Sequence, residues 1–405
     1  MDKNILIGKL QNGLKYYIYK DEISYNIYTY LINKCGSIEE KHDEIGISHL
    51  LEHLILESIN ILDCKSRVSG YTDFNEVVFR MYRPESNLIN IHNMMYIINK
   101  VMNHEILNET ILKKTQKMIT EEYDCYKEET IIKKRIISFI TNNKINDIPI
   151  GDREILNKLS FRQLVQYYRE RYLPDNMAII IISNIDVDEV EKIIHESLTF
   201  YSGRSYNRIN YLNVINSNVK EPWKVDILDL KNDNKSKNIK IFHRYYNESK
   251  EIKNKLIKYL YYRVFENYVI ENFKLNNIDI NELILGDKEL GDKYKFYSLS
   301  FNTYNHEKSI KIYNKIIQHI GFEEWNIDDE KDKLRAFLSF MKKDTINIHP
   351  EDIYNSYLYN FLYNEPIFFY ETHYNLILEL LEKINSTDIK KYFDKISRKY
   401  TIVIT

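Results

Sequence analysis

The beginning of the chain alternates between apolar and polar residues in a way that predicts strands. Residues 10–20 read LQNGLKYYIYK, and the Asn12-Gly13 pair between two apolar stretches is a strong signal for a hairpin turn. A further strand is expected from Ile27 to Cys35. A polar segment then leads into ISHLLEHLIL, whose apolar residues repeat with the period of a helix. The chain is therefore expected to open with a sheet and a helix that packs on it.

Long helical patterns follow, interrupted by two further apolar strands. The strands are predicted at Val77–Tyr82, before Pro84, and at Met177–Ser183, after Pro174. The helices are predicted at Leu88 to about His104, Leu107 to about Tyr126, FRQLVQYYRERY from residue 161, and Val187–Leu198. Together these elements predict a complete α+β domain over residues 1–200.

The second half of the chain repeats this order less clearly. Residues 201–238 are polar, rich in Asn, Ser and Lys and without periodicity, and they are predicted to be a linker. After them, a strand at Ile239–His243, a helix at Lys253–Asn272 and a strand near Tyr294–Phe301 are expected. The terminal NSTDIKKYFDKI and YTIVIT mirror the helix and strand that end the first half. Residues 239–405 are therefore predicted to be a second, homologous α+β domain.

Composition restricts the class of protein. The 405 residues are 44% apolar and 29% charged, as expected for a globular chain of at least two domains. A net charge of −2 provides no overall field that attracts nucleic acid or anionic lipid, and no apolar run approaches the roughly 18 residues of a membrane span. The first ten residues lack the pattern of a signal or transit peptide, and three widely spaced cysteines suit reduced thiols. We expect a cytoplasmic protein that binds neither nucleic acid nor membranes.

Candidate chemistry lies in the first predicted helix after the strands. Residues four apart share one face of a helix, so His49 and His53 can present two imidazoles to one metal ion. Glu52 lies beside them and can take a proton from a water molecule whose pKa a zinc ion lowers. The order H-x-x-E-H is the inverzincin motif. Five residues of this kind also occur on ordinary solvated helix faces, so the motif needs a third ligand elsewhere.

The third ligand is expected to be a carboxylate on another long helix, where ITEEYD offers Glu121 and Glu122. Glu122 shares a helix face with Ile119 and Thr115, a face that is expected to point inward, whereas Glu121 falls on a side rich in lysine. Glu122 is therefore the predicted ligand. The alternative is that both carboxylates only decorate a solvated helix.

These segments resemble the pitrilysin-like or insulinase-like metallopeptidases (peptidase family M16), especially their short, two-domain branch that includes mitochondrial processing peptidases and bacterial peptide-processing homologues. The resemblance covers most of residues 4–198. It rests on LQNGLKYYIYK, GSIEE, EIGISHLLEHLILES, YTDFNEVVF, TEEYDCY, DIPIGDREIL and YRERYLPDNMAIIIISNIDVDEVEKII, in the order and near the spacing of the family.

The resemblance implies two domains of the LuxS/MPP-like metallohydrolase fold, each an antiparallel-rich sheet packed with helices. It also implies one Zn²⁺ per chain at His49, His53 and Glu122, with Glu52 as the general base, and two such pairs of domains around a chamber. A homodimer or a heterodimer with a related chain is therefore expected.

The chain departs from the family pattern at three places. Thr115 stands where the family usually has a second acidic residue. The segment Ser69-Gly70-Tyr71-Thr72, a candidate substrate-binding segment, lacks the Asn of the corresponding family motif. The family also uses an Arg and a Tyr of the second domain to hold the substrate carbonyl. The nearest basic residue here is Lys274, while Tyr294 and Tyr297 do not align well.

The sequence thus supports a zinc endopeptidase for short, unstructured peptides that would bind along an exposed sheet edge at Val68–Thr72. The resemblance makes a bacterial precursor peptide the expected kind of substrate. The alternatives are a non-catalytic subunit of a peptidase complex and a protein that binds metal without hydrolysis. The predicted ligands and Glu52 are all present, which favours the enzyme.

Overall fold

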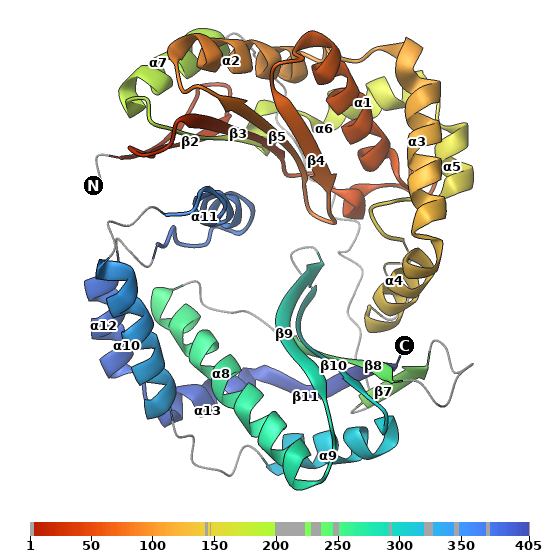
Figure 1. Ribbon diagram of the computed structural model, residues 1–405. Coiled ribbons are helices and arrows are strands. Elements are labelled where there is room, and N and C mark those ends of the chain that lie inside the picture. Colours follow the sequence, from red (N-terminus) through yellow and green to blue (C-terminus); the bar gives the residue numbers. More distant parts are fainter. Residues whose placement is uncertain are drawn as a thin grey trace. The chain divides into compact units, whose positions relative to one another are not determined.

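The chain folds into two compact units. The computed structural model describes residues 4–141, 145, 147–198, 223–227, 236–245, 251–290, 294–319, 327–343, 348–369 and 373–404. The first unit contains residues 1–134, 145–214 and 347–363, and the second contains residues 135–144, 215–346 and 364–405. Figure 1 labels most elements of both units.

A six-stranded sheet forms the centre of the first unit. Its strands are β1 (Ile5–Lys9), β2 (Lys15–Lys20), β3 (Asn26–Asn33), β4 (Arg67–Thr72), β5 (Val77–Pro84) and β6 (Met177–Ser183), in the order β1-β2-β6-β3-β5-β4. Only β2 and β6 are parallel. The hairpin predicted at Asn12-Gly13 joins β1 and β2, and Gly13 has the positive φ of 97° that favours glycine. Strand β4 is one edge of the sheet.

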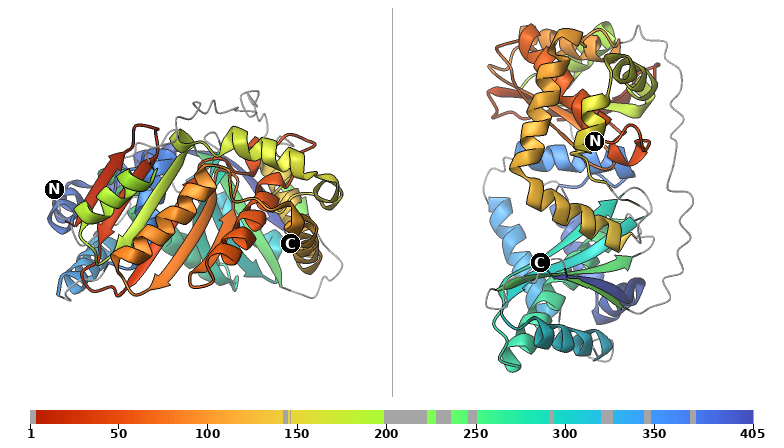
Figure 2. Two further views of the ribbon diagram at one scale, coloured as in Figure 1. Left: turned by 90° about the horizontal axis from the view of Figure 1, so that it is seen from above. Right: turned by 90° about the vertical axis from the view of Figure 1, so that its right-hand side faces the viewer.

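Helices cover one face of this sheet. They are α1 (Ile47–Leu62), α2 (Leu88–Met102), α3 (Leu112–Cys125), α5 (Arg153–Lys158), α6 (Phe161–Arg171) and α7 (Val187–Leu198), while α4 (Lys127–Ile140) spans the boundary between the units. Figure 2 shows α2 and α7 lying side by side across the strands. Alternate residues of the strands, such as Leu31, Phe79 and Ile181, are fully buried in the core beneath the helices.

The opposite face of the same sheet contacts α11 (Pro350–Tyr363), a helix from the second half of the chain (Figure 1). Tyr354 stacks on Tyr30 and Tyr357 stacks on Tyr17, with ring centroids 4.2 and 5.0 Å apart. Both faces of the sheet are therefore covered, which explains why every residue of the apolar strand β6 is buried.

The second unit repeats the arrangement of the first. Its strands are β7 (Trp223–Ile227), β8 (Lys237–Tyr245), β9 (Asn281–Leu290), β10 (Tyr294–Thr303) and β11 (Ile396–Ile404), in the order β7-β11-β8-β10-β9. As in β2-β6-β3-β5-β4, the first pair is parallel and the other three are antiparallel. Its helices are α8 (Ile252–Leu275), α9 (His306–His319), α10 (Asp328–Lys343), α12 (Tyr374–Lys383) and α13 (Ser386–Lys395). The predicted fold class, two related α+β domains, is confirmed.

The structure differs from the expected organisation in three respects. Strand β7 and the start of β8 lie within residues 201–238, which were predicted to be a linker, and most of the other residues of that segment lie outside the described ranges. Strand β9 has no counterpart among the predicted elements. Helix α11 belongs to the first unit, although it lies beyond residue 239. Within the described ranges, no helix is both long enough and apolar enough to cross a bilayer.

Candidate metal centre

The predicted metal ligands come from two neighbouring helices. His49 and His53 lie one turn apart on α1, and Glu122 lies on α3, which packs against α1. The two histidine Nε2 atoms are 3.1 Å apart, and Glu122 Oε2 lies 3.7 Å from Nε2 of His49 and 3.5 Å from Nε2 of His53. Three donor atoms therefore converge on one point. In the described part of the chain, this is the one group of three or more such side chains close enough to share a metal ion.

Glu121 points away from this group. Its carboxylate lies 3.6 Å from Lys117 Nζ, and both side chains are exposed. On the inner side of α3, Thr115 and Ile119 are completely buried, as expected for the face that Glu122 shares. The helical period therefore places Glu122, and not its neighbour, beside the two histidines.

The spacing of the three donors fits zinc. With Zn–N and Zn–O distances of about 2.0–2.2 Å, the ligand atoms of a tetrahedral site lie roughly 3.3–3.6 Å from one another. The three observed separations of 3.1, 3.5 and 3.7 Å bracket this range. Two imidazoles and one carboxylate leave a fourth position open, as in catalytic zinc sites.

The pKa values of the three donors depend on one another. Burial, reinforced by the charge of His53, lowers the pKa of His49 to about 4 and keeps it neutral, as a ligand must be. Burial also acts to lower the pKa of His53, but Glu122 and Glu52 outweigh it and raise that pKa. The hydrogen bond with His53 in turn lowers the pKa of Glu122.

Glu52 is held against strand β4 beside the donors. Its side chain is only 3% exposed, and burial raises its pKa to about 7. The hydroxyl of Thr72 donates a 2.7 Å hydrogen bond to Glu52 Oε2. On the other side, a Cβ added to Gly70 would lie 2.9 Å from Glu52 Oε1, so only glycine leaves room for the carboxylate. One carboxylate is thus fixed by two residues of one strand.

The candidate substrate-binding segment divides between the two faces of the sheet. Gly70 and Thr72 face α1, whereas the hydroxyl of Tyr71 is 2.9 Å from that of Tyr354 on α11. Ser69 is exposed. All four residues were predicted to bind substrate, and the contacts of Gly70 and Thr72 with Glu52 were not predicted. The period of two along a strand was the available signal, because it places residues 70 and 72 on the same face.

Other residues singled out by the sequence lie elsewhere. The hydroxyl of Thr115 donates to the carbonyl of Ile111 in its own helix, at 2.9 Å. In the second unit, Lys274 is exposed in the last turn of α8. Tyr297 is buried in the core of that unit, and the side chain of Tyr294 is outside the described residues. Tyr297 is therefore not available to a substrate carbonyl in this conformation.

The second unit contains the structural counterpart of α1 without its histidines. Helix α8 connects β8 to β9, as α1 connects β3 to β4 in the matching sheet. Its sequence, IKNKLIKYLYYRVFENYVIENFKL, contains no histidine. The duplication has therefore preserved the fold but not the donor set.

Part of the chain matches a known family model, and its fold matches a solved structure. Residues 158–243 match the family described as the peptidase M16 inactive domain. The crystal structure of the first half of the periplasmic protease PqqL from Escherichia coli has the same fold. It superposes with a TM-score of 0.81 at 19% identity, covering 100% of this chain and 92% of that chain. The family match does not include the segments that carry His49, His53 and Glu122.

Two individual relatives are also named as peptidases. The chain is 28% identical over 216 residues to the Haemophilus influenzae protein named "Probable zinc protease PqqL", covering 49% of this chain and 23% of that protein. It is 27% identical over 210 residues to the chloroplastic stromal processing peptidase of Arabidopsis thaliana, covering 46% and 16%. The chain thus spans a quarter or less of the length of these relatives. The matches support a relationship to the M16 peptidases.

Proposed function

We propose that this chain carries the zinc site of a metallopeptidase that hydrolyses unstructured peptides. The observation that carries the proposal is the convergence of three donors from α1 and α3 at 3.1–3.7 Å, with the buried Glu52 one residue from a donor. The similarity of this chain to a protein named as a probable zinc protease supports the same class of reaction, peptide hydrolysis.

In this proposal, His49, His53 and Glu122 hold the ion. When bound, zinc supplies a Lewis acid that polarises a peptide carbonyl and lowers the pKa of a water molecule. Glu52 accepts the proton of the attacking water and delivers it to the leaving amine. Thr72 and Gly70 keep the Glu52 carboxylate in one orientation, so the base need not reorganise before it takes the proton.

The sheet edge offers a binding mode for the peptide. Strand β4 is an edge of the six-stranded sheet, and its residues 70 and 72 touch Glu52. An extended peptide added to β4 would therefore pass directly beside the general base. Recognition through main-chain hydrogen bonds predicts tolerance of many side-chain sequences.

Zinc analysis combined with peptide hydrolysis tests this proposal. The parent is expected to contain one zinc per chain and to cleave unstructured peptides, and Glu52→Gln is expected to keep the zinc but lose cleavage. Glu121→Gln is a matched control, because Glu121 loses the same charge but is exposed and lies 3.6 Å from Lys117 Nζ, away from the donors. Equal cleavage by the parent and Glu52→Gln would refute the role of the base.

A second candidate function is a metal-binding subunit without catalysis. Its supporting observation is the match of residues 158–243 to a family described as inactive. This candidate predicts one zinc per chain and no cleavage that depends on Glu52, either alone or with a related chain.

We further propose that a complementary M16-like chain, or a further part of a longer protein, completes the site. The oxyanion of the reaction needs donors, and loss of one such donor typically costs roughly a hundredfold in rate. Tyr297 is buried in the core of its own unit and cannot serve in this conformation. Cleavage by the zinc-loaded chain is therefore expected to rise when a homologous chain is added. Full activity of the chain alone would contradict this requirement.

A further inference from the structure

Helix α1, which carries His49 and His53, has no cap of its own. Its N-cap residue is Gly46, at φ 91°, and no acidic residue lies in its first turn. A Cβ at Gly46 would lie 2.9 Å from the backbone of Gly151, so that position has no room for the usual capping side chain. The first N–H groups of the helix must therefore find an acceptor elsewhere.

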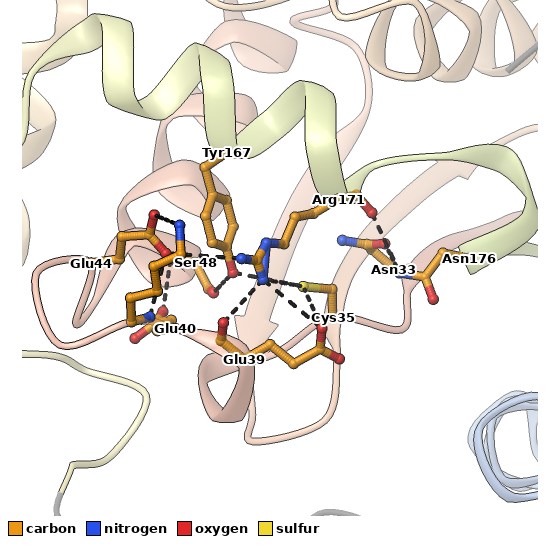
Figure 3. A network of polar contacts seen from close by, with 10 residues as sticks. Asn33, Cys35, Glu39, Glu40, Glu44, Ser48, Tyr167, Arg171 and Asn176 are labelled. Carbon is orange, nitrogen blue, oxygen red and sulfur yellow. Dashed lines mark hydrogen bonds and ion pairs between the residues drawn. The ribbon is translucent and has the colours of Figure 1, made fainter. Parts of the chain in front are cut away.

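Glu40 is that acceptor. Its Oε2 accepts a 2.7 Å hydrogen bond from the N–H of Gly46, and its Oε1 accepts a 2.9 Å bond from the N–H of Ser48. The carboxylate lies in the loop between β3 and α1, as Figure 3 shows, and also faces the positive end of the helix dipole. Burial raises the pKa of Glu40 to about 7, and the two N–H groups act to lower it.

Helix α6 holds this loop in place through Tyr167 and Arg171. The hydroxyl of Tyr167 is 2.7 Å from that of Ser48, and the Arg171 guanidinium lies over the Tyr167 ring at 4.4 Å. Arg171 donates to the carbonyl of Glu39 at 3.0 Å and lies 3.9 Å from a carboxylate oxygen of Glu44. Figure 3 shows both side chains of α6 reaching down to the loop.

We propose that Glu40 is a positioning residue for the metal centre, which it serves by fixing the first turn of α1. This inference rests on the proposed zinc site and assigns a role to a residue that does not touch the ion. Ser48, which Glu40 binds, immediately precedes His49 in the chain. A displaced first turn would move Nε2 of His49 away from Glu122, whose position depends on a different helix.

The test compares Glu40→Gln with Asp43→Asn. The glutamine amide can accept only one of the two N–H bonds that Glu40 accepts and turns an NH₂ group toward the other. Asp43 is the matched control, since it belongs to the same loop and its substitution removes the same charge, but its side chain is exposed. Three quantities are measured for each folded protein. They are the zinc dissociation constant by chelator competition, the visible absorption of the Co²⁺-substituted protein, and the melting temperature with and without metal.

Glu40→Gln is expected to bind zinc about tenfold more weakly, with an altered Co²⁺ spectrum and a smaller rise in melting temperature on metal addition. Asp43→Asn is expected to bind zinc within twofold of the parent. A purely structural cap would lower the melting temperature without metal and leave the zinc constant and the spectrum unchanged, which would overturn the inference.

If Glu40→Gln does not fold, the Tyr167→Phe variant is used to test whether the first turn of α1 positions His49. It removes only the hydroxyl beside Ser48 and leaves the ring beneath Arg171. Weaker zinc binding with an altered spectrum is expected, and parent-like values would overturn the inference. A parent that binds no zinc would instead refute the proposed function itself, and the inference with it.

Discussion

Thr72 donates a 2.7 Å hydrogen bond to the carboxylate of Glu52, and this contact joins the edge strand β4 to the helix that carries the metal donors. It connects the strand proposed to bind the peptide with the carboxylate proposed as the general base. A peptide that pairs with β4 would pair with the strand that orients the base. Substitutions along β4 should therefore change turnover without removing the metal.

Thr72→Val tests this connection. Valine keeps the shape of threonine and removes the donor to Glu52, so zinc content should be unchanged while kcat falls about tenfold at similar KM, because a hydrogen bond to a charged group contributes roughly 1.5–3 kcal/mol. Thr72→Ser should restore most of the activity, since it restores the hydroxyl. Steady-state kinetics with one unstructured peptide measures both. A Thr72→Val enzyme with parent kcat would show that the contact does not orient the base.

Gly70→Ala should impair both stability and activity. The new Cβ would lie 2.9 Å from Glu52 Oε1 and 2.9 Å from the carbonyl oxygen of Val78, so the strand or the base must shift, at a cost of about 1–3 kcal/mol. Gly286 on β9, the corresponding edge strand of the second unit, is the control. A Cβ there would meet nothing closer than Ser298 Oγ at 3.7 Å. Urea unfolding should separate the two variants, and equal stabilities would contradict the predicted clash.

Glu122→Gln and Glu121→Gln should differ sharply in metal content. Glu122 faces both histidines, whereas Glu121 pairs with the exposed Lys117. Loss of a direct ligand should weaken zinc binding by more than the roughly 10–100-fold typical of an outer contact, and His49→Ala should have a similar effect. Elemental analysis after dialysis against a chelator measures the difference. Retention of zinc by Glu122→Gln together with its loss in Glu121→Gln would move the ligand by one residue.

The other end of α1 should make stability depend on pH. Asp63, at the C-cap of the helix, accepts two hydrogen bonds of 2.5 and 2.6 Å from the buried Arg83. Burial acts to raise the pKa of Asp63, but the hydrogen bonds of Ser66 and Lys65 and the charge of Arg83 outweigh it and hold that pKa below 3.8. A depressed folded-state pKa stabilises the protein above the unfolded value, and this stability is lost as the pH falls through the folded value.

Asp63→Asn should therefore be less stable than the parent by about 2–3 kcal/mol at pH 7, because it leaves the charge of Arg83 unpaired in a buried place. The difference should begin to shrink below about pH 4, where Asp63 of the unfolded chain becomes protonated, and should be lost as the pH falls through the lower pKa of Asp63 in the folded parent. Asp186→Asn, which breaks an exposed pair with Lys20, should change stability by less than about 1 kcal/mol. Chemical unfolding at several pH values measures all three, and a difference independent of pH would contradict the assignment.

Local patterns were sufficient to predict most elements of the first unit and to place the candidate donors on their helices. The spacing of His49 and His53 places two imidazoles on one helix face. The apolar residues of α3 repeat with the same helical period, and this repeat favours Glu122 over Glu121. The Asn12-Gly13 hairpin and the burial of Met177–Ser183 likewise depend on residues close in sequence. The order in which such elements recur was enough to predict the duplication.

Only the tertiary structure decided which distant residues meet. Helix α11 is amphipathic, but nothing in its sequence states that Tyr354 stacks on Tyr30 in the first unit. The segment that forms β7 was predicted to be a linker, because its strand structure depends on pairing with the distant β11. In the same way, the sequence shows Glu40 only as an acidic residue in a polar segment. Its hydrogen bonds with the first N–H groups of α1 are visible only in the folded structure. Such contacts depend on burial and on the path of the chain, because a short sequence period specifies a face and not its partner.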